Sequence, residues 1–150
     1  MTEFLLKHTT AVTDPIVAGS IDYLRNVLDV DRVAVAGYCF GGRYAFRFLG
    51  PQAGVDVGFA AHPSNLQDAE IEAIARPVAV AAAETDNLLP PARRHEVEAE
   101  LQAVGQPYWW SVYSGTNHGF AVRINVTDPE MVFGKETAFL QALRWFDNFL

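Results

Sequence analysis

The chain has 150 residues, half of them hydrophobic with ten Phe and three Trp, which is enough to bury the core of one globular domain. Its 11 basic and 18 acidic side chains give a formal charge of −7, which argues against a nucleic-acid partner and an anionic membrane surface. One cysteine excludes an internal disulfide, and the chain has neither a signal-peptide pattern in residues 1–8 nor an apolar run of roughly 20 residues, so we expect a cytoplasmic protein.

Turn signals and the spacing of apolar residues divide the chain into alternating helices and strands. Helix starts are marked at Asp14-Pro15, Pro90-Pro91 and Asp128-Pro129, and helix ends at Gly50-Pro51 and Gly105. Continuous apolar runs predict strands that are buried on both faces. The predicted elements, in chain order, are a helix over 13–28, a strand over 32–36, a helix up to 49, a strand over 55–61, a helix over 66–75, a strand over 78–83, a helix over 91–104, a strand over 108–113, a loop over 114–119 and a helix from 128 to 150.

This alternation predicts a single α/β domain over residues 1–150, with a mostly parallel sheet covered by helices on both faces. In such sheets the active site lies at the carboxyl ends of the strands. Cys39, Asp86 and His118 each follow a predicted strand directly. We therefore expect these three reactive side chains at the same edge of the sheet.

Residues 37–42, Gly-Tyr-Cys-Phe-Gly-Gly, have the layout of a nucleophile elbow with Cys39 where serine usually stands. So sharp a turn from strand to helix strains the backbone of the nucleophile, and Gly37 and Gly41 are expected to remove Cβ atoms that would clash. The N–H of Phe40 opens the following helix, where it can face a developing oxyanion, and the helix N-terminus favours a thiolate. A plain tight turn with a buried thiol is the alternative, and this short match alone does not separate the two.

The chain order of nucleophile, acid and base is the order that α/β-hydrolases use. His118 would accept the proton of Cys39 and later deliver it to the leaving group, while Asp86 would bind the far ring nitrogen and stabilise the imidazolium. Glu84, two residues earlier, is a rival for the role of the acid. Each group alone could belong to an ordinary turn or loop, but three of them at three strand ends favour the catalytic interpretation.

The other three histidines are weaker candidates. His95 is expected to be solvated on a charged helix face, and His8 lies in a polar N-terminal stretch. His62 follows a strand and could line the cleft, but a structural role is favoured because a triad needs only one base. One cysteine and four scattered histidines lack metal-ligand spacing, and the glycines of 37–42 match neither a dinucleotide fingerprint nor a P-loop, so no metal or cofactor is predicted.

At this point the chain resembles the dienelactone hydrolase family of α/β-hydrolases. The resemblance rests on residues 37–42, on Glu-Thr-Asp at 84–86 and on His-Gly-Phe-Ala-Val-Arg at 118–123, and it covers nearly the whole chain. The phrases Ala-His-Pro-Ser at 61–64 and Ala-Leu-Arg-Trp-Phe at 142–146 look like the branch that is common in fungi.

The resemblance implies a Cys-Asp-His triad, here Cys39, Asp86 and His118, that opens enol-lactones such as dienelactone to linear keto acids. It implies an acyl-cysteine intermediate and no metal or cofactor, and substrates in the wider family extend to other lactones and small esters. Family members also hold the substrate carboxylate with basic side chains. Arg123 is the candidate for this role, although it stands one position later than the arginine of the best-known branch, and Tyr38 is a second candidate substrate contact.

Family domains are considerably longer than this chain, which begins at the helix before the elbow strand. The resemblance therefore implies a carboxy-terminal portion without the first strands, the second oxyanion N–H, a second arginine and a glutamate that helps to activate the cysteine. The elbow strand would then have a free edge, which favours self-association or a partner chain. Two further functions stay open: a non-catalytic remnant or interaction module that needs a partner chain to complete its site, and a redox-sensitive thiol at Cys39.

Overall fold

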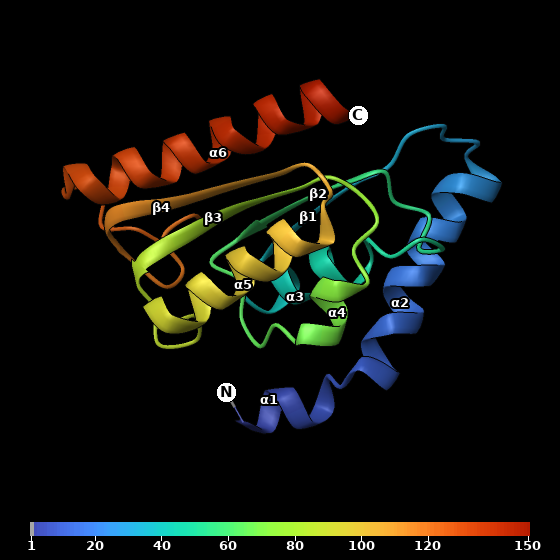
Figure 1. The fold of residues 1–150 in the computed structure, drawn as a ribbon, viewed down its shortest axis with the longest axis horizontal. Coiled ribbons are helices and arrows are strands. Elements are labelled where there is room, and N and C mark those ends of the chain that lie inside the picture. Colours follow the sequence, from blue (N-terminus) through green and yellow to red (C-terminus); the bar gives the residue numbers. More distant parts are fainter. Residues whose placement is uncertain (1) are drawn as a thin grey trace.

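Four strands form one sheet in the computed structural model, which describes residues 2–150 (Figure 1). The sheet has the order β1-β2-β3-β4, and each strand pairs in parallel with the next strand along the chain. The prediction of a mostly parallel α/β fold is confirmed. The strands are β1 (Ala34–Tyr38), β2 (Val57–Ala61), β3 (Val78–Thr85) and β4 (Tyr108–Asn117).

Helices cover both faces of this sheet, as the sequence predicts. Helix α6 lies along one face against β2, β3 and β4, and α3, α4 and α5 lie on the opposite side (Figure 1). No helix within residues 2–150 is both long enough and apolar enough to cross a membrane. The helices are α1 (Thr2–Lys7), α2 (Thr10–Asp22), the π-helix η1 (Tyr23–Val27), α3 (Phe40–Arg47), α4 (Asp68–Glu72), α5 (Pro91–Val104) and α6 (Pro129–Phe149).

The apolar run of β3 supplies both cores. Val78, Val80 and Ala82 belong to the core beneath α3 and α5, whereas Ala79 and its alternate neighbours belong to the core beneath α6. Successive strand residues point to opposite faces, so a strand covered on both sides must be apolar throughout. The run of alanines also lets the helices approach the middle of the sheet closely.

The first long helix begins earlier than predicted. The sequence signal at Asp14-Pro15 looks like a helix start, but α2 begins at Thr10 and carries Pro15 inside. Asp14 lies inside α2, five residues after its N-cap Thr9, and its carboxylate accepts hydrogen bonds from the guanidinium of Arg47 at 2.5–3.0 Å. Helix α1 was not predicted at all, and Phe4 within it packs edge-on against Phe40.

Strand β4 continues to Asn117, through part of the segment that was predicted as a loop. Ala83 pairs with Tyr113 and Thr85 pairs with Asn117, so β4 bulges between these pairs. Gly115 has a left-handed φ of 71° in the bulge, and its N–H donates to the carboxylate of Glu84 at 2.8 Å. A bulge re-aims the end of a strand, and this one determines where the residue after β4 lies.

Candidate active site

Four reactive or polar residues stand directly after the four strands: Cys39 after β1, His62 after β2, Asp86 after β3 and His118 after β4. The backbone hydrogen bonds between neighbouring strands continue to three of these residues. The backbone N–H groups of Cys39, His62 and His118 donate to carbonyls of the neighbouring strand at 3.1, 2.8 and 3.2 Å. The sheet itself therefore brings these residues to one edge, as expected for parallel strands.

The turn at Cys39 has the strained backbone that is typical of an elbow, with φ 54° and ψ −115°. A Cβ at Gly37 would lie 2.1 Å from the carbonyl oxygen of Gly41, and a Cβ at Gly42 would lie 2.7 Å from Pro63. Gly41 itself has open space where its Cβ would be, so the prediction that Gly41 avoids a clash is wrong. The glycines that the turn needs are Gly37 and Gly42.

Helix α3 begins at Phe40, immediately after the cysteine. The N–H groups of a first helical turn have no carbonyl partner within the helix, so the N–H of Phe40 is available to a developing negative charge. The phenyl ring of Phe40 packs against Tyr44 with ring centroids 5.0 Å apart. The predicted oxyanion donor therefore stands at the start of α3, beside the sulfur.

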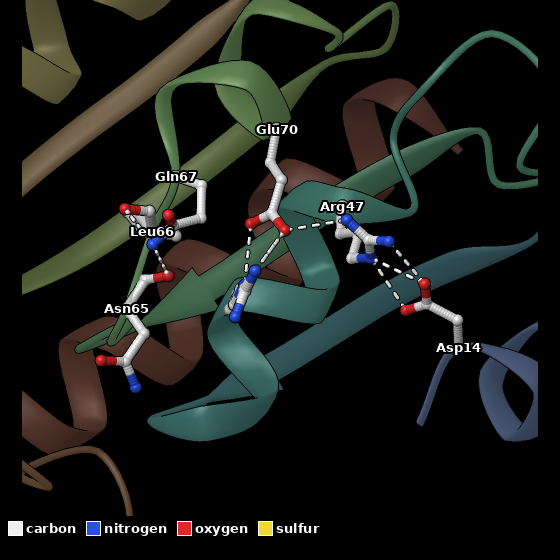
Figure 2. Close-up of polar contacts among 7 residues, drawn as sticks. Asp14, Arg47, Asn65, Leu66, Gln67 and Glu70 are labelled. Carbon is white, nitrogen blue, oxygen red and sulfur yellow. Dashed lines mark hydrogen bonds and ion pairs between the residues drawn. The ribbon is translucent and has the colours of Figure 1, made fainter. Parts of the chain in front are cut away.

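Ion pairs fix the elbow helix to its neighbours. The carboxylate of Glu70 on α4 is buried and accepts hydrogen bonds from both Arg43 and Arg47 of α3, at 2.7–3.1 Å. Figure 2 shows Arg47 between Glu70 and Asp14 of α2. Since both arginines project from the helix that follows Cys39, this network holds the elbow against the rest of the chain.

The side chain of His118 lies between the other two predicted residues. Its Nε2 is 3.0 Å from Cys39 Sγ, and its Nδ1 is 2.7 Å from Asp86 Oδ2. Asp86 is buried, and its other oxygen accepts the backbone N–H groups of Leu88 and Leu89 at 2.8 and 3.3 Å. These bonds fix the carboxylate, which in turn orients the imidazole toward the sulfur.

The electrostatics of this arrangement favour a charged imidazole. The hydrogen bond that Nδ1–H of His118 donates to Asp86 raises the pKa of His118 to about 9, and the nearby Cys39 acts in the same direction, whereas burial opposes them. At neutral pH the ring is then an imidazolium that directs an N–H at the sulfur. A cation at hydrogen-bond distance stabilises a thiolate, which is the nucleophilic form of cysteine.

Glu84, the rival acid, lies elsewhere. Its carboxylate accepts the N–H of Gly115 in the bulge of β4 and lies 3.5 Å from the hydroxyl of Ser114. The residue that hydrogen-bonds His118 is Asp86. Glu84 therefore supports the strand that precedes His118 and does not orient the ring.

The two predicted substrate contacts flank the same edge. Arg123 is exposed, and its Nη2 lies 3.5 Å from the point where a Cβ of Gly119 would stand, next to His118. Tyr38 is 37% exposed and precedes the cysteine, with its ring 6.1 Å from that of His62. Arg123 thus lies beside the residue that follows His118, and Tyr38 directly precedes Cys39.

The remaining three histidines differ in their exposure to solvent. His95 is exposed, and His8 is also exposed, with Nδ1 2.8 Å from the Phe4 carbonyl. His62 is 1% exposed, and its ring lies edge to face against His118 at 5.1 Å between centroids. Its position directly after a strand was the only sequence signal for this contact. In the part of the chain that the structure describes, no group of three or more Cys, His, Asp or Glu side chains is arranged to hold a metal ion.

Residues 1–150 match the profile of the dienelactone hydrolase family. The hydrolase pyvD of Aspergillus violaceofuscus is 39% identical over 148 residues, which are 99% of this chain and 60% of that protein. The hydrolase tropI of Talaromyces stipitatus is 40% identical over 143 residues, which are 95% of this chain and 56% of that protein. The chain thus spans somewhat more than half the length of these relatives.

Solved structures agree in fold. A structure from Klebsiella pneumoniae, assigned to the dienelactone hydrolases, superimposes with a TM-score of 0.81 at 15% identity. The match covers 99% of this chain and 68% of that one. The parallel sheet, the profile match and the fungal relatives lead to one conclusion: the chain belongs to the dienelactone hydrolase family.

Proposed function

We propose that this chain carries the catalytic triad of a hydrolase that opens enol-lactones or small carboxylic esters. The observation that carries the proposal is the position of His118, with Nε2 3.0 Å from Cys39 Sγ and Nδ1 2.7 Å from Asp86 Oδ2. Nucleophile, base and orienting acid within hydrogen-bond reach of one another are the signature of covalent catalysis.

In the proposed reaction the thiolate of Cys39 adds to the carbonyl carbon of the substrate. The carbonyl oxygen becomes an oxyanion, which the N–H of Phe40 stabilises. The bond to the leaving oxygen then breaks, and the imidazolium of His118 gives that oxygen its proton. Acyl-cysteine remains, and an enol leaving group rearranges to the ketone.

Water completes the cycle. Neutral His118 accepts a proton from water as the oxygen adds to the acyl carbon, and the carbon–sulfur bond breaks. The carboxylic acid product leaves, and the thiolate and imidazolium are restored. Asp86 keeps the imidazole in one tautomer throughout, so the same nitrogen faces the sulfur in both half-reactions.

The substrate class is proposed from the charge around the sulfur. Arg123 carries a cation beside His118, and within residues 2–150 its guanidinium has no ion-pair partner. A guanidinium binds a carboxylate through a bidentate pair. We therefore propose that the preferred lactone or ester carries a carboxylate, which Arg123 would bind while Tyr38 contacts the ring of the substrate.

The test is hydrolysis of an activated ester and of dienelactone by the purified chain and by its Cys39→Ala variant. Activity that disappears in the variant, with at least a thousandfold loss, is the expected result, and His95→Ala serves as an exposed control that keeps full activity. No turnover by either protein, with Cys39 alkylated at the rate of an ordinary thiol, would overturn the proposal and favour the non-catalytic remnant or interaction module.

A further inference from the structure

His62 combines two unfavourable features at one position. The side chain is 1% exposed, and neither ring nitrogen has a hydrogen-bond partner among the residues that the structure describes. Its backbone is left-handed, with φ 36°. Each unpaired buried polar group costs about 1–3 kcal/mol, and a left-handed backbone in a residue other than glycine costs about as much.

A leucine would occupy a similar volume without unpaired nitrogens. Buried polar groups that lack partners call for a specific explanation, and such costs concentrate at functional sites. His62 stands one residue after β2, between the strand ends that carry Cys39 and Asp86. The ring is therefore at the centre of the edge where the triad residues meet.

The neighbours of the His62 ring are aromatic. It meets His118 edge to face, with centroids 5.1 Å apart and an interplanar angle of 66°. Phe120 and Tyr38 lie at 5.7 and 6.1 Å. The pairs with His118 and Phe120 are edge to face, which is a favoured aromatic geometry, and the Tyr38 ring is tilted at 52°, so aromatic rings pack against His62 from three residues.

Two hydrogen bonds do not fully fix an imidazole. The Cβ attachment and the bonds at Nδ1 and Nε2 set the mean plane of the His118 ring, but hydrogen bonds weaken only gradually with angle, so the ring can still rock about its Cβ–Cγ bond. A ring packed against it limits this rocking, because the motion would drive one ring into the other. His62 makes such a contact from the strand next to the nucleophile.

We propose that His62 is a positioning residue: its buried imidazole packs edge to face on His118 and fixes the plane of that ring. The proposal rests on the role of His118 as the base, as proposed above. The contact keeps both nitrogens of His118 aligned with their partners, so it supports the bond to Asp86 that makes the ring basic.

The charges around His62 agree with this geometry. Burial, and to a smaller extent the positive charges of His118 and Arg123, lower the pKa of His62 to about 4, while Asp86 acts in the opposite direction. The pair then carries one positive charge, on His118. The two histidines make stability depend on pH in opposite directions. Stability falls as the pH drops from about 6.5 to 4, because the unfolded chain protonates His62 more readily than the folded one. Stability also falls as the pH rises from about 6.5 to 9, because the folded chain holds the proton of His118 more tightly than the unfolded one.

The test is the variant His62→Leu, which removes both the flat ring and its two unpaired nitrogens, read by two methods that do not need turnover. We expect the alkylation of Cys39 by iodoacetamide at pH 7 to slow about tenfold, since small misplacements of reactive groups have large effects on rate. NMR titration of labelled histidine is expected to show the pKa of His118 moving down toward its ordinary value. The melting temperature is expected to stay or rise, because two unpaired nitrogens are removed.

The control is Val97→Ala, a buried change on α5 that lowers stability and leaves the alkylation rate and the His118 titration unchanged. If leucine at this left-handed backbone position prevents folding, His62→Gln, which also lacks the aromatic face, replaces it and is expected to show the same losses. An unchanged alkylation rate together with an unchanged His118 pKa would overturn the proposal. A wild-type chain that shows no hydrolysis, but whose alkylation depends on His62, would contradict the proposed function and leave the role of His62 standing.

Discussion

The two sides of the proposed triad, an acid–base side of Asp86 and His118 and a nucleophile side of Cys39, are supported very differently. Asp86 follows β3, which is paired on both sides, and His118 follows β4, which is packed against α6. Cys39 follows β1, which pairs with β2 alone within residues 2–150. The elbow is instead held through α3, whose arginines reach the carboxylates of α2 and α4.

Because of this difference in support, the orientation of His118 and the position of the Cys39 sulfur depend on different interactions. The orientation of His118 depends on short hydrogen bonds inside the sheet, so it should respond to single substitutions near Asp86. The position of the sulfur depends on strain in a turn and on ion pairs outside the sheet. Within residues 2–150 the outer edge of β1 is unpaired, like that of β4, so its backbone groups can pair with another strand.

The largest effect is expected from Asp86→Asn, which breaks the acid–base side. The amide cannot stabilise the imidazolium, so kcat/KM should fall about a thousandfold, and the pKa of His118 should fall toward its ordinary value. Steady-state kinetics and NMR titration measure these changes. The matched control is Glu84→Gln, which removes a carboxylate two residues away and is expected to keep activity within about threefold. Equal losses in the two variants would contradict the assignment of Asp86.

The next effect concerns the free edge of β1. We propose that this edge pairs with the same edge of a second copy of the chain, and that Ala36→Lys weakens this association about a hundredfold, since two like charges would then face each other. Sedimentation at several concentrations measures the dissociation constant. A wild-type chain that is strictly monomeric at every concentration would refute the proposed pairing.

A smaller effect is expected from Glu70→Gln on the nucleophile side. Two guanidinium groups would lose their shared carboxylate, whose side chain is 7% exposed, and the free energy of unfolding should fall by about 2 kcal/mol. Urea unfolding measures this loss. The control is Asp68→Asn, whose side chain is 69% exposed beside Arg93 and should change stability by less than about 0.5 kcal/mol. Similar losses in both variants would mean that burial does not strengthen the Glu70 pairs.

The alternation of strands and helices could be predicted because the period of apolar residues changes along the chain. The first and last residues of helices and strands were harder to predict where a residue type is compatible with two different structural roles. Asp14 reads as a helix cap but pairs with Arg47, and the turn residues around Gly115 read as a loop but form a bulge within β4. In both cases the structure is determined by partners that lie far away in the sequence, so a local sequence pattern cannot predict it.

The residues after the strands were predictable as a set, because parallel strands place their ends together. The roles of two neighbouring residues, Gly42 and His62, could not be predicted. Gly42 is needed because Pro63 lies against it, and Pro63 comes from another strand end. His62 could only be placed beside His118 once the order of β2, β3 and β4 was known. Spacing along the chain identifies candidates, and contacts between strands decide what they do.

The smallest effect is expected from Arg123→Gln, which tests whether substrate recognition belongs to the acid–base side. The guanidinium stands beside Gly119, directly after His118, so a bound carboxylate would lie next to the imidazole. Loss of one charged contact should raise KM about tenfold for a carboxylate-bearing lactone, with kcat nearly unchanged, because the contact is made equally before and during the reaction. The control is the methyl ester of the same substrate, whose KM should not change. A loss that is equal for both substrates would mean that Arg123 acts on the site itself, and recognition would then have to come from the side of β1, where Tyr38 stands.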